Sequence, residues 1–214
     1  MTHSADLSHE YALYQQGYRY VAGLDEAGRG AWAGPVVAGA IILPLDHFDL
    51  AHALEGVNDS KQLTPVQRQR LLPIIMQTAV AVSVGRATRE EIDTLGIVPA
   101  THLAMQRAID QLTVPPDALL TDALRLTLSP LPCFPVIKGD QRSLSIAAAS
   151  IVAKVTRDHH MAELDDLYPQ YGFRLHKGYG TPLHRRMLQQ FGPCPEHRTS
   201  YAPVRALLPP SQEK

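Results

Sequence analysis

The 214-residue chain contains only two cysteines, one tryptophan and 6% aromatic residues. Cys133 and Cys194 form no Cys-x-x-Cys pair, which excludes a disulfide scaffold and a structural zinc site of the usual spacing. The N-terminal segment lacks the apolar core of a signal peptide. The longest apolar run, residues 36–44, falls far short of the roughly 20 residues that a membrane helix needs. We therefore expect a soluble protein in a reducing cytoplasm, with no membrane partner.

Charge is also scarce, because 20 Lys and Arg against 21 Asp and Glu leave a net charge of −1. That value alone argues against a nucleic-acid partner. However, residues 1–137 hold 9 basic and 14 acidic side chains, a net of −5. Residues 138–205 hold 10 basic and 6 acidic side chains, a net of +4, together with five histidines. The near-zero average conceals an acidic part and a basic part, and the basic part is the one expected to meet a polyanion.

The order of apolar patterns predicts a mixed α/β fold. Alternating or short apolar runs predict strands at residues 18–25, 36–43, 80–86, 118–124 and 133–138. Helical spacing and cap signals predict helices at residues 65–78, 99–112, 143–167 and 182–191. The first two strands flank a glycine-rich turn and suggest a hairpin, whereas Pro73 is expected to kink or shorten its helix. Residues 1–17 read as a lead-in, and the segment after Pro193 reads as mostly irregular.

Acidic residues follow three of the predicted strands. Asp25 and Glu26 end the first strand, Asp122 lies in the fourth and Asp140 comes just after the fifth. Each has a structural alternative: a solvated turn for the first pair, an exposed or salt-bridged strand end for Asp122, and a helix N-terminus or an ion pair for Asp140. Together, four carboxylates at strand ends suit Mg²⁺ or Mn²⁺, the ions that support phosphodiester cleavage.

Two further segments carry groups suited to a nucleic acid. Gly28, Arg29 and Gly30 offer backbone N–H groups and a guanidinium in a turn that leads into a strand, which argues against a dinucleotide loop. Tyr179 lies between two glycines and is free to stack on a sugar or base. The basic residues nearby could contact phosphates, namely Lys177, Arg185 and Arg186. A locally packed tyrosine beside a solvated basic helix is the alternative.

From residue 21 to 204 the chain resembles the type 2 ribonucleases H, the bacterial ribonuclease HII family. The resemblance rests on several motifs in order: DEAGRG at 25–30 with AGPVV at 33–37, NDSKQL at 58–63, IDTLGI at 92–97, KGD at 138–140, SIAAASIVAK at 145–154 with Arg157-Asp158, HKGYGT at 176–181, and GPCPEHR at 192–198 with SYAPV at 200–204. It implies an α/β fold of the ribonuclease H-like type, with a mixed sheet flanked by helices and a small helical C-terminal portion. Residues 18–168 would form the catalytic domain, and residues 169–214 would complete the substrate cleft.

The resemblance also implies a function and a site. The function is metal-dependent hydrolysis of RNA in RNA–DNA hybrids and 5′ of single ribonucleotides embedded in duplex DNA, leaving 3′-hydroxyl and 5′-phosphate ends. The metal site maps onto Asp25, Glu26, Asp122 and Asp140. Gly28, Arg29 and Gly30 would read the ribose 2′-hydroxyl, and Tyr179 would sense the RNA–DNA junction. Phosphate contacts are expected from four cations, Lys61, Lys177, Arg185 and Arg186.

Other features are interpreted structurally or left open. Asp158 is expected to pair with Arg157, Cys133 to lie in the core, and Trp32 either to pack or to touch substrate. His176, His184 and His197 could assist phosphate contact. One departure from the family is Ala123, which stands where the third acid is usually followed by glycine. The chain is expected to act as a monomer. The alternatives are another carboxylate-metal nuclease or phosphatase, and a non-catalytic hybrid-binding module.

Overall fold

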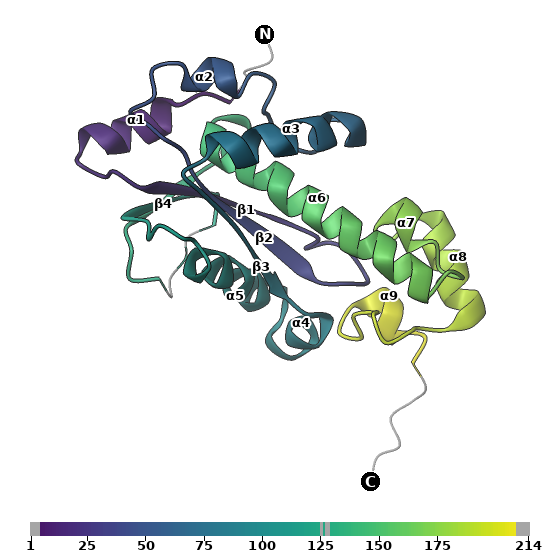
Figure 1. Ribbon diagram of the computed structural model, residues 1–214. Coiled ribbons are helices and arrows are strands. Elements are labelled where there is room, and N and C mark those ends of the chain that lie inside the picture. The colour runs from purple at the N-terminus through teal and green to yellow at the C-terminus, as the bar shows by residue number, and fades with distance from the viewer. Residues whose placement is uncertain (1–4, 125, 127–128, 209–214) are drawn as a thin grey trace.

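The computed structural model describes residues 5–124, 126 and 129–208. A five-stranded mixed sheet in the order β3-β2-β1-β4-β5 lies at its centre, with helices on both faces (Figure 1). The strands are β1 (Val21–Ala27), β2 (Val36–Ile42), β3 (Ala81–Ala87), β4 (Ala118–Asp122) and β5 (Cys133–Val136). β1, β2 and β3 are antiparallel neighbours, whereas β4 runs parallel to β1 and to β5. The predicted α/β class and the first hairpin are confirmed.

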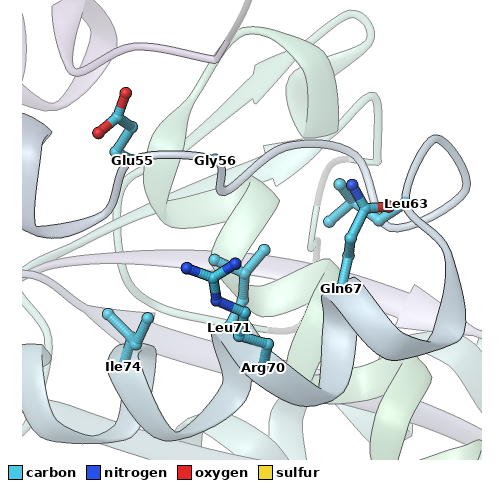
Figure 2. A pocket seen from close by; sticks show the side chains of 7 residues that line it. All are labelled: Glu55, Gly56, Leu63, Gln67, Arg70, Leu71 and Ile74. Atoms are coloured by element: carbon cyan, nitrogen blue, oxygen red, sulfur yellow. The ribbon is translucent and has the colours of Figure 1, made fainter.

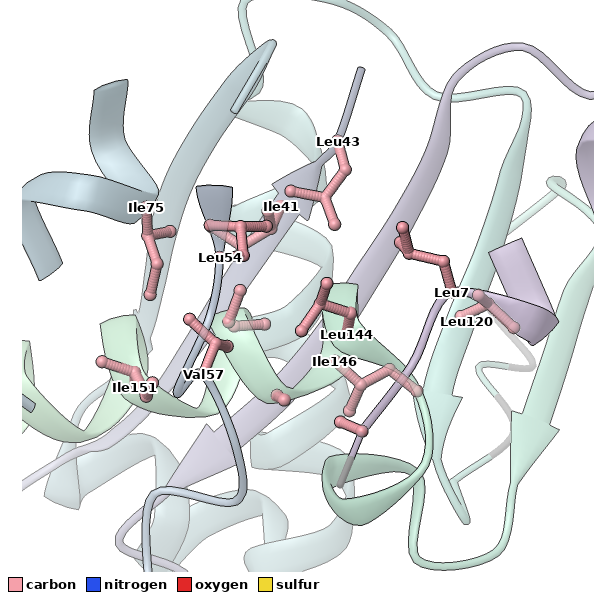
Figure 3. Packing of buried hydrophobic residues seen from close by; sticks show 14 of the residues in the cluster. Leu7, Ile41, Leu43, Leu54, Val57, Ile75, Leu120, Leu144, Ile146 and Ile151 are labelled. Atoms are coloured by element: carbon pink, nitrogen blue, oxygen red, sulfur yellow. The ribbon is translucent and has the colours of Figure 1, made fainter. Parts of the chain in front are cut away.

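One face of the sheet is covered by the long helix α6 (Leu144–Leu167), which crosses β1 and β2 (Figure 1). Its close approach requires glycine in both strands, because a Cβ at Gly23 would lie 2.4 Å from the Ser145 carbonyl carbon and one at Gly39 would lie 2.6 Å from the Ala149 oxygen. Figure 3 shows the apolar side chains that fill this layer, including Ile41 of β2 and Ile146 of α6. The helices α1 (Ser8–Gln15), α2 (Leu50–Ala53) and α3 (Pro65–Thr78) contribute to the same layer.

The opposite face packs against α5 (Ile97–Asp110), preceded by the short α4 (Arg89–Leu95). Alternation along β1 divides the core, because Val21 points to the α6 layer whereas Ala22 and Leu24 point to the α5 layer. Cys133, expected in the core, is half-buried at the edge of the α5 layer. Most of these positions are fully buried, so the sheet is a rigid platform for the residues at its strand ends.

Helix boundaries agree with the cap signals more closely than strand boundaries do. Thr64 forms a capping box with Gln67 and starts α3, which runs through Pro73 to Thr78, so the helix does not end early at this proline. Ser143 caps α6 through the Ile146 amide. β4 ends at Asp122, two residues earlier than predicted, because Ala123 takes a left-handed φ of 54°. β1 begins at Val21 and not at residue 18.

The C-terminal part gathers at the far end of α6 (Figure 1). It contains α7 (Phe173–His176), α8 (Pro182–Phe191) and α9 (Ala202–Arg205), the last within a segment predicted to be irregular. Phe173 and Tyr171 pack against Met161 and Leu164 of α6 and against Ala33 from the hairpin loop. No helix of the described residues is long and apolar enough to cross a membrane.

Candidate active site

The topology brings three of the predicted acids to one end of the sheet. β1 and β4 pair in parallel up to Leu24 and Thr121, and β1 then continues against β2 alone. Asp25 and Glu26 therefore lie just beyond the last β1–β4 pair, next to Asp122 at the end of β4. The carboxyl ends of parallel strands are the usual position of sites in such sheets.

The fourth acid reaches this region through a turn after β5. Asp140 is in the 3₁₀ turn η1 (Gly139–Gln141), and the preceding Gly139 amide donates to Asp122 Oδ1 at 2.8 Å. Lys61, from the loop before α3, donates from Nζ to Asp140 Oδ2 at 2.9 Å. This contact links the predicted phosphate-binding lysine to the acids.

These residues border a cleft of about 590 Å³. Seven of the predicted site residues line it together: Asp25, Glu26, Asp122, Gly28, Arg29, Gly30 and Lys61. Tyr179 lines it from the C-terminal part, although more than 50 residues separate it from Asp122 in the sequence. Asp140 touches this set through Lys61, whereas Lys177, Arg185 and Arg186 lie outside the lining.

Burial and crowding make the charged forms of these acids costly. Burial raises the pKa of Asp25 well above its ordinary value, and the neighbouring Glu26 and Asp122 raise it further. Burial also raises the pKa of Glu26, although Arg29 donates to its Oε1 at 3.0 Å and opposes the shift. The pKa of Asp140 is raised by burial and by Asp122 against the opposing effect of Lys61. Desolvation lowers the pKa of Lys61, but the carboxylates around it raise that pKa overall.

The donor set suits a hard divalent cation in charge and chemistry. Glu26 Oε2 is buried and has no hydrogen-bond partner within the described part of the chain, so one carboxylate oxygen is left available at the cleft. A cation would relieve the repulsion that raises the pKa values of these oxygen ligands. In the described residues, no three His, Cys, Asp or Glu side chains are already arranged as a closed ligand set. The acids are therefore gathered near one another without forming a completed cage.

The glycine-rich loop, residues 28–35, is held from behind by two buried arginines. The Arg157 guanidinium donates to the carbonyls of Ala33, Pro35 and Lys177 at 2.9–3.0 Å. Gly28 has a φ of 99°, and a Cβ there would lie 2.0 Å from Arg157 Nε, so both the backbone and the space require glycine. The predicted Arg157–Asp158 ion pair is wrong, because Asp158 instead accepts from Lys154 at 2.7 Å.

Arg198 is the second of these arginines and comes from the C-terminal part. Its guanidinium donates to the carbonyls of Gly28, Arg29 and Gly34 at 2.8–3.0 Å. Arg198 has no exposed surface, and burial lowers its pKa. Its guanidinium therefore contacts the carbonyls of the loop and has no contact with solvent. The loop that contains the predicted 2′-hydroxyl reader is thus fixed by Arg157, for which the sequence predicted a different partner, and by Arg198, which sequence reasoning did not single out.

Tyr179 and the predicted basic contacts occupy different environments. The Tyr179 ring is 36% exposed and lies 5.5 Å from the Arg157 guanidinium carbon and 5.8 Å from Lys154 Nζ. Arg185 and Arg186 are exposed on α8, and the Arg185 guanidinium carbon lies 5.5 Å above the Trp32 ring. Trp32 therefore packs within the protein, between Arg185 and the backbone of Gly180.

The three histidines expected to assist phosphate contact are buried. His184 and His197 have no exposed surface, and His176 is 7% exposed. Desolvation lowers the pKa of His184 and of His197 to about 4, so both rings are neutral at pH 7. Their role is internal to the C-terminal part, and the phosphate-contact interpretation is wrong.

Sequence reasoning missed Ser60 and Lys154, which also line the cleft. Burial lowers the pKa of Lys154, while its ion pair with Asp158 opposes the shift. A lone lysine in the apolar half of a buried helix was the available signal, because such a charge is costly unless it has a partner or a function.

A separate cavity of about 250 Å³ lies beside α3, with Leu63, Leu71 and Ile74 among the side chains that line it (Figure 2). None of the predicted acids lines it.

The mixed sheet, with carboxylates crowded at its parallel strand ends beside a rigid glycine-rich loop, defines a nuclease of the ribonuclease H class. The family model for Ribonuclease HII matches residues 22–204. The chain belongs to the ribonuclease HII family. It is an endoribonuclease that acts on RNA–DNA hybrids.

Individual relatives agree with this assignment. The chain is 53% identical over 205 residues to Ribonuclease HII of Chloroflexus aggregans, covering 96% of this chain and 97% of that protein. The solved ribonuclease H2 from Pyrococcus horikoshii OT3 matches with a TM-score of 0.71 and 27% identity, over 87% of this chain and 96% of that one. Bst-RNase HIII, solved in complex with Mn²⁺, shares the fold with a TM-score of 0.66 at 22% identity, over 91% of this chain and 70% of that one.

Proposed function

We propose that the protein cleaves duplex DNA on the 5′ side of a single embedded ribonucleotide, in addition to the RNA of longer hybrids. The products would carry 3′-hydroxyl and 5′-phosphate ends. The observation that supports this proposal is one shared cleft in which Asp25, Glu26 and Asp122 lie with the Gly28–Gly30 turn and Tyr179. A site of this kind can combine a hydrolytic centre with groups that test the sugar on each side of the scissile phosphate.

The hydrolytic centre would use Asp25, Glu26, Asp122 and Asp140 to hold one or two Mg²⁺ or Mn²⁺ ions. The raised pKa values of Asp25, Glu26 and Asp140 and the unpartnered Glu26 oxygen support this role. When bound, a divalent cation supplies Lewis-acid polarisation of the phosphate and makes an attacking water more acidic. Lys61, held by Asp140, would orient a phosphate oxygen from the other side of the cleft.

The sugar would be tested by the backbone and by one aromatic ring. Gly28, Arg29 and Gly30 line the cleft, and their backbone N–H groups would hydrogen-bond a ribose 2′-hydroxyl, the group that separates RNA from DNA. The Arg29 guanidinium donates a hydrogen bond to Glu26, so the positive charge of Arg29 lies beside the acids. Tyr179 would stack on the deoxyribose that follows the ribonucleotide, because its ring borders the cleft and remains partly exposed.

The C-terminal portion predicted at residues 169–214, of which 209–214 lie outside the described residues, would complete the cleft and follow the nucleic-acid backbone through residues 169–208. Arg185 and Arg186 present exposed charge on α8, and Lys177 lies beside α6 with Nζ 3.4 Å from the Asp158 carbonyl. Such contacts bind phosphates without reading sequence and weaken as salt rises. We further propose that the protein acts as a monomer in the cytoplasm.

Cleavage of a duplex that contains one ribonucleotide tests the proposal, with parallel reactions in Mg²⁺, Mn²⁺ and EDTA. We expect one cut on the 5′ side of the ribonucleotide in either metal and none in EDTA. An all-DNA duplex is the substrate control and should remain intact. Cleavage of only the long hybrid would reject single-ribonucleotide recognition, and binding without any cleavage would favour the hybrid-binding alternative.

Tyr179→Ala separates junction sensing from general catalysis. We expect a loss of about tenfold or more in kcat/KM on the single-ribonucleotide duplex, because base and sugar stacking contributes about 1–3 kcal/mol. The long hybrid, which has RNA on both sides of most cuts, should lose less. Equal losses on both substrates would contradict the junction role.

A further inference from the structure

A buried cluster of imidazoles lies directly behind Tyr179. His184, at the start of α8, places Nδ1 3.0 Å from the Tyr179 carbonyl oxygen and Nε2 3.0 Å from His197 Nε2. At the other end, the Cys194 amide nitrogen lies 2.9 Å from His197 Nδ1 and the Cys194 thiol lies 3.1 Å from the same atom. These contacts form one continuous chain from Cys194 to Tyr179.

The backbone groups at the two ends of this row of hydrogen bonds determine which nitrogen of each imidazole carries the proton. A backbone carbonyl can only accept a hydrogen bond, so His184 must carry its proton on Nδ1. A backbone amide can only donate, so His197 Nδ1 must be unprotonated, and its proton must lie on Nε2. The central contact then has one donor, His197 Nε2–H, and one acceptor, His184 Nε2. Both ends independently require the same arrangement, and it exists only when both rings are neutral.

The surroundings favour this neutral state. Both rings have no exposed surface and lie among aromatic side chains, including Phe173 and Trp32. Desolvation and the neighbouring imidazoles lower both histidine pKa values to about 4. Burial raises the pKa of Cys194 to about 11, so its thiol keeps its proton and places no negative charge beside His197. A second proton on either ring would place two donors face to face.

The same cluster holds the other backbone groups of the Tyr179 loop. His176 stacks on His184 at 4.3 Å between ring centroids, and its Nδ1 accepts from the Gly178 amide at 3.2 Å. The Trp32 amide donates to the Gly178 carbonyl at 2.8 Å. The short segment around Tyr179 is therefore fixed through its backbone, which leaves the ring free to meet a ligand in the cleft.

We propose that His184 and His197 are positioning residues for Tyr179, acting through an ordered hydrogen-bond relay with the proton on Nδ1 of His184 and on Nε2 of His197. The inference rests on the proposed role of Tyr179 in binding the junction sugar. In this arrangement, the tautomers of two buried rings set the position of the backbone that carries the Tyr179 ring, although neither imidazole lines the cleft.

The tautomers are tested directly by ¹⁵N NMR of the imidazole rings in the wild-type protein at pH 7, a measurement that needs no substrate. We expect His184 protonated on Nδ1 and His197 and His176 protonated on Nε2. An Nε2-protonated His184, or a positively charged ring at either position, would reject the relay whatever the protein cleaves.

The positioning role is tested by a double-mutant cycle with Tyr179→Ala on the single-ribonucleotide duplex. His184→Phe keeps the ring volume but removes both hydrogen bonds, and should lower kcat/KM about tenfold, the size of one lost buried hydrogen bond. His184→Asn keeps an N–H near the Nδ1 position and should recover part of that loss. In the Tyr179→Ala background, His184→Phe should add little, because the group that it positions is gone. The control is His52→Phe, an exposed position on α2.

The outcomes separate the two claims. Equal losses from His184→Phe in both backgrounds would mean that the relay only supports the fold, and would overturn the positioning role. If Tyr179→Ala itself leaves the single-ribonucleotide rate unchanged, the proposed function of Tyr179 fails instead. If His184→Phe does not fold, His184→Asn in the same cycle gives the answer, because it loses the hydrogen bond from His197, and a loss through the relay should again disappear in the Tyr179→Ala background.

Discussion

The acids in the cleft and the polar groups behind it are both buried, but they are satisfied to very different degrees. Asp25 and Glu26 lie beside Asp122, whose negative charge raises the pKa of both, and Glu26 Oε2 has no hydrogen-bond partner among the described residues. Behind them, every guanidinium nitrogen of Arg198 donates to a backbone carbonyl. The first region is destabilised until a ligand arrives, whereas the second is complete without one. The acids that we propose to be catalytic are thus supported by buried polar groups that already have hydrogen-bond partners.

The largest contrast is expected from Asp25→Asn. It should lower kcat/KM about a thousandfold, because losing an interaction worth several kcal/mol in the transition state has that effect. It should raise the free energy of unfolding at pH 7 by at least about 1 kcal/mol, the equivalent of less than one pKa unit, because it removes a buried negative charge beside two other acids. Cleavage assays and urea denaturation measure the two effects. Asp110→Asn, an exposed position on α5, is the matched control and should change neither.

Arg198→Met should behave in the opposite way. The carbonyls of Gly28, Arg29 and Gly34 would lose their buried donor, and we expect the free energy of unfolding to fall by about 3 kcal/mol. Urea denaturation is again the measurement, with the exposed Arg205→Met as the control. A change in the free energy of unfolding below about 0.5 kcal/mol, the ordinary range of surface substitutions, would contradict a stabilising role for the hydrogen bonds of Arg198.

The two regions should also respond to pH with opposite signs. The native pKa of Asp25 is raised, so its destabilising effect is present above that pKa and is relieved as pH falls toward its ordinary value of 3.8. His184 has a native pKa lowered to about 4, so its stabilising effect is present above 6.5 and is lost as pH falls from 6.5 toward 4.

Metal-free stability curves from pH 4 to pH 8 would measure these responses. The stability gained in Asp25→Asn and the stability lost in His184→Phe should both shrink toward pH 4, each by at least about 1 kcal/mol, the equivalent of less than one pKa unit. Parallel curves for wild type and either variant would contradict the assigned shift for that residue.

The smallest expected effect concerns the strand end that carries Asp122. Ala123 has a φ of 54°, a conformation that costs a non-glycine residue roughly 1–2 kcal/mol. Ala123→Gly should therefore raise the free energy of unfolding by about 0.5–1 kcal/mol, after the entropic cost of glycine in the unfolded chain. Thermal denaturation at fixed pH measures this, and a destabilised variant would show that the turn tolerates alanine without strain.

Sequence reasoning succeeded where the signal is local. Thr64 and Thr181, each followed by proline, marked two helix starts correctly, and the acids were found because carboxylates at strand ends are conspicuous. It failed where the partner is remote. Arg157 was assigned to the adjacent Asp158, but its partners are carbonyls more than 100 residues earlier and in the loop before Tyr179. Arg198 and His197 carry no local mark of their roles, since only the fold brings the C-terminal segment to the hairpin loop.

The most direct test of the contrast is calorimetric titration of Mn²⁺ into the metal-free protein, without substrate. The wild type and the Asp110→Asn control should bind Mn²⁺, and Asp25→Asn should lose at least tenfold in affinity, in line with the loss of a ligand that also orients its neighbours. Under the same conditions, Arg198→Met should retain binding wherever it remains folded. Equal Mn²⁺ affinity in the wild type and Asp25→Asn would contradict the account that the crowded acids are held ready for a cation.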